Sequence, residues 1–271
     1  WLRRKRLQEQ ALVLDELFAG SIADALTRRE VAPLDKVEKA ALSQVPALNT
    51  LEFLAPSNQI KILAEVKRAS PSRGQMAEIP DPAALAKIYA DNGASAISVL
   101  TEERKFKGSL ADLISVRENV SVPLLRKDFI ANEYQILEAR AAGADIILLI
   151  VAGLPQKDIE RLKHFAEELG MTAFVETHSE DELKRALDVD TKLVGINARD
   201  LSTFETDRNL FGSLVHLIPA SVIKVAESAV RNADDVAHYR AAGADVALVG
   251  EALVTNDPAA MLQSFLAAGK S

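Results

Sequence analysis

The stretch ILAEVKRASPSRG at residues 62–74 sets an acid and a base at the end of an apolar segment. Glu65 and Lys67 are two residues apart, so in a β-strand both side chains point to the same side. A glutamate and a lysine held together in a partly dry pocket can be tuned to accept and donate protons. The residues therefore predict a strand that carries reactive groups at its end.

Other apolar segments of strand length also end in polar side chains. Any single one of these groups could be a surface residue or a loop clamp. Because the carboxyl ends of parallel strands meet at one edge, however, the whole set predicts a common site. The groups that follow or close these segments are Lys127, Glu176, Asn197, Arg199, Glu227, Ser228 and Glu251.

A repeat along the chain indicates how these ends are brought together. Three segments, DNGASAISVL, AAGADIILLI and AAGADVALVG, each carry a Gly-Ala step before an apolar run. Their glycines, Gly93, Gly143 and Gly243, are 50 and 100 residues apart. Both gaps are multiples of about 25 residues, the length of one strand, one helix and their loops.

Eight strands alternating with helices predict a closed (β/α)₈ barrel of the TIM type. The alternative is an open doubly wound sheet, but no Gly-rich phosphate turn follows the first strand. We expect residues 1–58 to form a helical extension that caps the barrel of residues 59–271, within a single domain 1–271. The expected strands are 61–66, 96–100, 122–126, 145–150, 171–176, 192–197, 222–227 and 246–250.

Helix boundaries follow from capping signals between the strands. Asp81 and Pro82 start one helical pattern, and Ser179 with Glu182 has the spacing of a capping box at the start of another. Polar turns after the seventh and eighth strands, AESAV and VGEAL, occupy the usual phosphate position of such barrels. A small phosphorylated substrate is therefore expected.

Composition narrows the class of protein. The net charge of −7 gives no basic field for nucleic acid, and the absence of cysteine excludes disulfides and a cysteine nucleophile. The longest apolar stretch, 146–152, is far shorter than the roughly 20 residues of a membrane span. The four histidines lack metal-ligand spacing, although His178 could reach Glu176. We expect a cytoplasmic protein that acts without a metal or an organic cofactor.

With these residues in view, the chain closely resembles indole-3-glycerol phosphate synthase, a tryptophan-pathway enzyme. The matching stretches are AEVKRASPSRG, SVLTEERKFKGSL, LLRKDFI, GADIILLIVA, GINARDL, VAESAV and ALVGEAL, in the family's order. The resemblance implies a (β/α)₈ barrel that closes the pyrrole ring of 1-(2-carboxyphenylamino)-1-deoxyribulose 5-phosphate. Carbon dioxide and water are released, and no cofactor takes part.

The resemblance also implies roles for the residues at the strand ends. Lys127 matches the general acid of ring closure, and Glu176 matches the glutamate that transfers protons during dehydration. Lys67 matches a second lysine that holds the substrate carboxylate or phosphate, or shares the acid role, so which lysine is the acid stays open. The polar groups that orient the lysines and the sugar hydroxyls are Glu65, Asn197 and Glu227.

Further implied contacts surround these groups. Phe106 and Phe129 flank the aromatic ring of the substrate, and the Ser-Pro-Ser-Arg-Gly loop acts as a flexible lid with Gly74 as a hinge. The family usually has Ser-Gly where this chain has Ser228-Ala229, which predicts weaker phosphate binding if the φ angle of Ala229 is positive. The remaining implied substrate and phosphate contacts are Ser70, Arg199, Leu201, Ser228, Ala229, Gly250 and Glu251.

Two other functions remain open from the sequence. One is a sugar-phosphate isomerase on a related barrel, such as phosphoribosylanthranilate isomerase, although such enzymes usually rely on a Cys/Asp or paired-Asp set. The other is a non-catalytic barrel that binds phosphorylated ligands. A monomer is expected, with association with other tryptophan-pathway enzymes left open.

Overall fold

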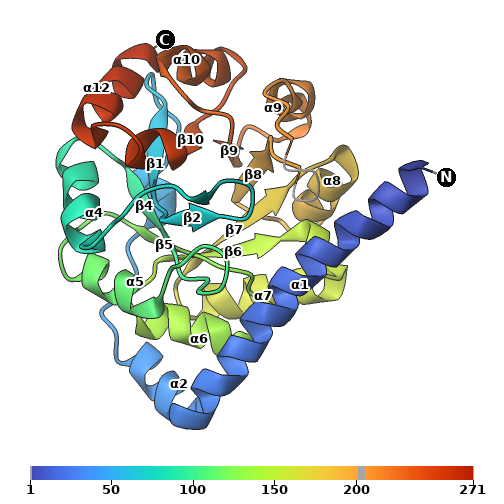
Figure 1. Cartoon of the computed structure of the whole chain (residues 1–271), viewed down its shortest axis with the longest axis vertical. Coiled ribbons are helices and arrows are strands. Elements are labelled where there is room, and N and C mark those ends of the chain that lie inside the picture. The colour runs from blue at the N-terminus through green and yellow to red at the C-terminus, as the bar shows by residue number, and fades with distance from the viewer. Residues whose placement is uncertain (1, 201–204, 271) are drawn as a thin grey trace.

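Parallel strands form the centre of the molecule. The computed structural model describes residues 2–200 and 205–270, with side chains described from residue 13. The strands are β1 (Lys61–Val66), β4 (Ala96–Leu100), β5 (Leu124–Lys127), β6 (Ile146–Ile150), β7 (Thr172–Thr177), β8 (Leu193–Asn197), β9 (Ile223–Glu227) and β10 (Val246–Val249). They close into a barrel in the order β1-β10-β9-β8-β7-β6-β5-β4 (Figure 1). The predicted TIM barrel is confirmed, and the open-sheet alternative is wrong.

Closure is visible in the pairing of β1, which lies parallel to β10 on one side and to β4 on the other. The strands are almost wholly buried, as expected for parallel strands with side chains inside the barrel and helices outside. Their observed limits agree with the expected ones to within two residues. The largest difference is at β5, which begins at Leu124 because Pro123 has no N–H to donate to the ladder.

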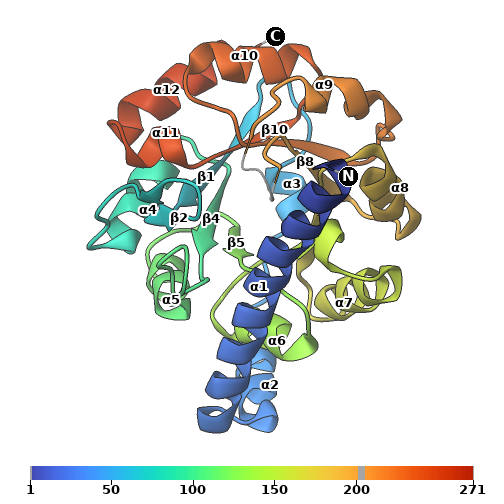
Figure 2. The ribbon, with the colours of Figure 1, turned by 45° about the vertical axis from the view of Figure 1, so that its right-hand side comes forward.

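Helices alternate with the strands and surround the barrel (Figures 1 and 2). As expected, Asp81 caps its helix by accepting from the Ala84 N–H at 3.0 Å, and Pro82 occupies the first turn. The main helices after β1 are α4 (Pro82–Asp91), α5 (Leu110–Arg117), α6 (Glu133–Ala141), α7 (Gln156–Glu168), α8 (Glu180–Asp188), α9 (Leu210–Leu214), α10 (Ala233–Ala241) and α12 (Pro258–Ala268). Shorter turns are η1 (Val151–Gly153), η2 (Val215–Leu217) and α11 (Glu251–Val254).

The first part of the chain forms α1 (Leu2–Val31), α2 (Leu34–Leu42) and α3 (Thr50–Phe53). Phe18 of α1 packs edge-on against Phe129, with ring centroids 5.5 Å apart, and α2 packs on α6 (Figure 2). Since α1 contributes to the same buried core as the barrel strands, we propose that the extension and the barrel form one domain. Within the described residues, no helix is long and apolar enough to cross a membrane.

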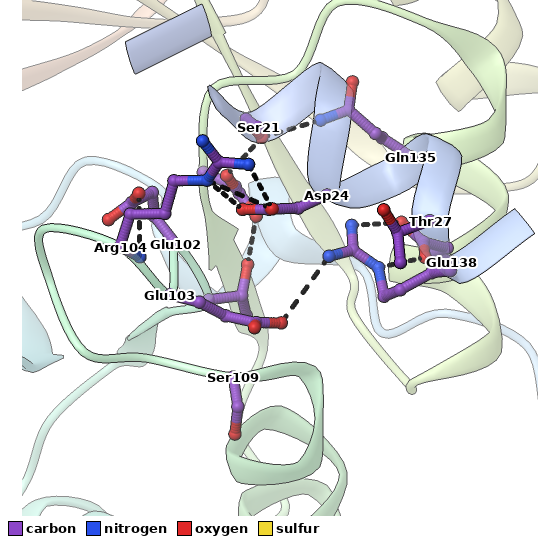
Figure 3. Close-up of polar contacts among 12 residues, drawn as sticks. Ser21, Asp24, Thr27, Glu102, Glu103, Arg104, Ser109, Gln135 and Glu138 are labelled. Atoms are coloured by element: carbon purple, nitrogen blue, oxygen red, sulfur yellow. Dashed lines mark hydrogen bonds and ion pairs between the residues drawn. The ribbon is translucent and has the colours of Figure 1, made fainter. Parts of the chain in front are cut away.

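Polar contacts fix α1 against the loops that surround the site (Figure 3). Asp24 pairs with Arg104 at 2.7 Å, which ties α1 to the loop between β4 and α5. Ser21 donates to the buried carboxylate of Asp128 at 2.8 Å, one residue beyond Lys127. The helix therefore holds the segment that follows β5, as well as the loop that carries Phe106.

A short hairpin follows β1 where the sequence predicted only a lid loop. Its strands are β2 (Ala69–Ser70) and β3 (Gly74–Gln75), paired antiparallel. Gly74 lies in the turn with φ +66°, a conformation that suits glycine. Arg73 in the turn contacts Glu251, which follows the neighbouring strand β10, with nitrogen and oxygen 2.8 Å apart. The hairpin thus spans toward the turn after β10.

Candidate active site

A lysine surrounded by glutamates lies at the carboxyl end of the barrel. The Nζ atom of Lys127, at the end of β5, is 3.1 Å from Glu227 Oε2 on β9 and 3.5 Å from Glu176 Oε2 on β7. Glu65 Oε2 on β1 is 3.9 Å away, and its other oxygen lies 2.6 Å from Lys67 Nζ. Four strands thus bring together the groups that the sequence placed at their ends.

Burial and mutual proximity set the charges of this cluster. Burial lowers the pKa of Lys127, but Glu227, Glu176 and Glu65 offset it, so the pKa lies above its ordinary value and the ammonium persists. Burial and the neighbouring Glu176 carboxylate raise the pKa of Glu227 to about 8, although Lys127 acts in the opposite direction. Glu227 is therefore protonated at neutral pH.

The pKa of Glu176 is shifted in the opposite direction to that of Glu227. Burial raises the pKa of its carboxyl, but Lys127, His178 and Asn197 together hold the pKa well below its ordinary value. Its Oε2 atom has no hydrogen-bond partner among the described residues, apart from its approach to the Lys127 ammonium. The site thus holds one ionised and one neutral carboxyl beside an ammonium, which is an arrangement suited to acid–base chemistry.

Asn197 at the end of β8 fixes the orientation of this cluster. Its Nδ2 group donates to Glu176 Oε1 at 3.1 Å, while Oδ1 accepts from the Ser228 hydroxyl at 2.7 Å. The same Oδ1 atom accepts from the backbone N–H of Arg199 at 3.0 Å. One amide therefore connects a carboxylate of the cluster with the turns after β8 and β9.

Room for the Glu227 carboxylate depends on the glycine in the neighbouring strand. A Cβ atom at Gly195 of β8 would lie 2.1 Å from Glu227 Oε1 and 2.7 Å from the Phe174 ring. Real Cβ contacts of that length essentially never occur, so any larger residue would displace Glu227 or the ring. Gly195 is thus a steric requirement of the site that the sequence analysis did not single out.

A cavity of about 770 Å³ opens above the cluster. Phe106 and Phe129 lie on one side with ring centroids 6.1 Å apart, which suits a flat aromatic group. On another side lie Ser228, Ala229 and Gly250 at the ends of β9 and β10. The cavity therefore combines an apolar side, a charged floor and a turn-rich side.

The turn after β9 has an unusual backbone. Ser228 and Ala229 both have positive φ angles, +67° and +59°, in the left-handed region that favours glycine. The Tyr239 hydroxyl donates to the Ser228 carbonyl at 3.2 Å and helps to hold this conformation. The φ angle on which the sequence prediction for Ala229 depended is positive.

The described residues contain no group of three or more histidine, aspartate or glutamate side chains arranged to hold a metal ion.

Comparisons with known proteins give the family. The family model of indole-3-glycerol phosphate synthase matches residues 14–265. A protein of that name from Leifsonia xyli is 63% identical over 253 residues, which cover 93% of this chain and 97% of that protein. Another from Mycolicibacterium smegmatis is 51% identical, over 96% of this chain and 95% of that protein.

The chain belongs to the indole-3-glycerol phosphate synthase family.

Solved structures of low identity share the fold. A 3-hexulose-6-phosphate synthase from Salmonella typhimurium superimposes with a TM-score of 0.60 at 13% identity, covering 77% of this chain and 98% of that chain. An N-acetylmannosamine-6-phosphate 2-epimerase from Clostridium perfringens gives 0.59 at 14% identity, covering 79% and 93%. These likenesses support the barrel alone.

The residues that the family resemblance singled out can now be placed. Leu201 lies outside the described residues, so its predicted contact with the substrate stays a prediction. The others line the cavity, and their individual roles remain proposals. They are Glu65, Lys67, Ser70, Phe106, Lys127, Phe129, Glu176, Asn197, Arg199, Glu227, Ser228, Ala229, Gly250 and Glu251.

Some features of the site were not found from sequence. Arg73 lines the cavity because the hairpin folds over it, and Leu17 lines it because α1 crosses nearby. No local sequence pattern predicts that either residue lines the cavity, because both positions depend on how distant segments of the chain pack together. His178 had a signal, its spacing of two from Glu176, and its Nε2 atom lies 3.2 Å from Glu176 Oε1.

Proposed function

We propose that this protein is an indole-3-glycerol phosphate synthase. It converts 1-(2-carboxyphenylamino)-1-deoxyribulose 5-phosphate to indole-3-glycerol phosphate, carbon dioxide and water. The observation that carries the proposal is the Lys127 ammonium held within 3.9 Å of three glutamates at the floor of a cavity with an aromatic side. Membership of the family supplies the reaction.

Binding uses the three sides of the cavity. The carboxyphenyl ring lies beside Phe106 and Phe129, and the phosphate lies at the turns after β9 and β10. Backbone N–H groups of the turn at Ser228 and Ala229 face the phosphate, supported by the partial positive charge of helix starts in that region. Lys67 is within reach of the substrate carboxylate or phosphate.

Ring closure uses the ammonium of Lys127. The ring carbon that bears the carboxylate attacks the ketone carbon, and a carbon–carbon bond forms while the ketone oxygen takes a proton from Lys127. The carboxylate then leaves as carbon dioxide, and its bonding electrons restore the aromatic ring. Stabilisation of the developing alkoxide by a fixed ammonium is effective because the site is largely buried.

Dehydration uses the two unlike carboxyls. The new hydroxyl leaves as water after gaining a proton from the Lys67 ammonium, and the adjacent CH₂ carbon loses a proton to the ionised Glu176. Glu227, neutral at pH 7, donates a hydrogen bond to a substrate hydroxyl instead of repelling it. Glu65 and Asn197 keep Lys67, Lys127 and Glu176 in position.

The proposal extends to the setting of the enzyme. The partner is a small phosphorylated substrate, and neither nucleic acid nor a membrane takes part. We propose that the enzyme is a monomer in the cytoplasm. Association with other tryptophan-pathway enzymes is compatible with this proposal. The hairpin of β2 and β3 would serve as the lid, since Arg73 lines the cavity and pairs with Glu251 at the turn after β10.

The test is turnover of the carboxyphenylamino substrate by the purified protein without added metal. Indole fluorescence and released carbon dioxide are followed together, and the proposal predicts equal amounts of both. Fluorescence without carbon dioxide would contradict the mechanism. Isomerisation of phosphoribosylanthranilate would favour the isomerase alternative, and tight binding of the substrate without turnover would favour the non-catalytic barrel.

A further inference from the structure

A buried histidine connects the site to the start of α8. His178 follows β7 directly, and its side chain is only 11% exposed. The Nδ1 atom lies 3.1 Å from Glu182 Oε2, and that same oxygen accepts the backbone N–H of His178 at 2.8 Å. On the other side of the ring, Nε2 lies 3.2 Å from Glu176 Oε1. The imidazole is thus clamped between two carboxylates.

This arrangement departs from the simple capping box expected there. Ser179 does cap α8, since its hydroxyl accepts the Glu182 N–H at 3.2 Å. The Glu182 side chain, however, turns to His178 and not to the N–H of Ser179. Its carboxylate therefore sets the position and orientation of the imidazole, which in turn faces Glu176.

We propose that His178, held by Glu182, is a positioning residue that keeps Glu176 ionised and turns its free oxygen toward the reacting groups. The inference rests on the proposed function, because Glu176 is there the proton acceptor. One oxygen of Glu176 accepts a hydrogen bond from Asn197 and forms an ion pair with His178, whose Nε2 has no hydrogen-bond partner among the described residues. The other, Oε2, is left for the cavity and lies 3.5 Å from Lys127.

The charges around the pair agree with this geometry. Burial lowers the pKa of His178, but Glu176 and Glu182 more than offset it and raise the pKa to about 10, so the ring is an imidazolium at neutral pH. The charged or titratable groups that face Glu176 are Lys127 from β5, His178 after β7, Glu227 from β9 and Glu65 from β1. Two of these are cations and two are carboxyls.

A consequence follows for the two carboxyls that share the floor of the site. Lys127 contacts both Glu176 and Glu227, whereas of these two carboxyls the imidazolium contacts Glu176 and not Glu227. The imidazolium of His178 is a second cation beside Glu176. It favours the ionised form of Glu176, so the proton stays on Glu227. His178 therefore decides which carboxyl acts as the base.

The test is a double-mutant cycle with His178→Gln and Glu176→Gln. Alone, His178→Gln should lower kcat by about tenfold to a hundredfold, the range typical of residues that orient a functional group, with little change in KM. In the Glu176→Gln background it should add no further loss, to within about twofold. His164→Gln, an exposed histidine on α7, is the control and should match the wild type.

A purely structural role would give other results. Loss of the same size in both backgrounds would overturn the inference, and so would an unchanged kcat in His178→Gln. An inactive wild type would instead refute the proposed function, so the two failures are distinguishable.

The pH profile gives a second, independent readout. Loss of the imidazolium should move the limbs of the kcat profile to higher pH by about one unit or more, because a cation no longer favours the ionised carboxyl pair. Glu182→Gln removes an anion and leaves the imidazolium paired with Glu176, so it should not move the limbs to higher pH. By releasing the ring it should lower kcat in the wild-type background and not in the Glu176→Gln background, and it serves if His178→Gln folds poorly. A His178→Gln profile that only loses height would contradict the inference.

Discussion

Ala229→Gly should stabilise the protein, because Ala229 has a φ angle of +59°. The left-handed conformation costs a non-glycine residue about 1–2 kcal/mol. Glycine recovers this strain but adds freedom to the unfolded chain, which offsets about 0.4–1 kcal/mol. The balance is about 1 kcal/mol in favour of glycine, and for a chain of this size it raises Tm by about 2–4 °C.

The assay is thermal unfolding of both proteins in the same buffer. Ala242→Gly is the matched control, because Ala242 is also half-buried but has a φ angle of −74°. Glycine there relieves no strain and should lower Tm, since it costs about 0.5–1 kcal/mol. An unchanged or lower Tm in Ala229→Gly, or equal shifts in the two variants, would refute the reasoning.

The same substitution tests the proposed phosphate turn. A turn without strain lets its N–H groups approach the phosphate more closely, so KM for the substrate should fall in Ala229→Gly while kcat stays similar. An unchanged KM would show that the strain at Ala229 does not affect phosphate binding. It would contradict the prediction that Ala229 weakens phosphate binding in this chain.

Three further predictions concern stability and the shape of the site. The raised pKa of Glu227, about 8 against 4.5, means that the folded state holds a proton that the unfolded chain loses. The free energy of unfolding should therefore fall as pH rises from about 4.5 to 8, and denaturant titrations of Glu227→Gln should show a flatter dependence. Ser21→Ala removes a donor to the buried Asp128 and should cost about 1–3 kcal/mol in denaturant unfolding, whereas no loss would show that α1 is held by other contacts. Gly195→Ala should lower kcat by displacing Glu227, while Gly212→Ala, whose added Cβ meets its first neighbour at 3.8 Å, should leave kcat unchanged.

Much of the barrel could be predicted because its strands are local patterns. The apolar run at 61–66 is buried on both faces and matches β1 at both ends. Capping residues such as Asp81 act within their own helix, so their effect is also readable in sequence. The polar groups at strand ends could be grouped because a barrel brings all such ends to one face.

The remaining features depend on contacts between distant segments. The hairpin of β2 and β3 is only two residues per strand, too short to produce a periodic pattern. The neutral state of Glu227 arises from burial beside Glu176, and no local motif encodes that distance. The role inferred for His178 likewise needed the direction in which Glu182 turns.

The central claim is that Lys127, surrounded by three glutamates, supplies the proton for ring closure. Its most direct test compares substrate binding and single-turnover indole formation in Lys127→Met with those in Lys87→Met, an exposed lysine on α4 paired with Asp91. The account predicts that Lys127→Met still binds the substrate but forms indole at least about a hundredfold more slowly, while Lys87→Met matches the wild type. Indole formation by Lys127→Met at close to the wild-type rate would contradict the account and would transfer the acid role to Lys67.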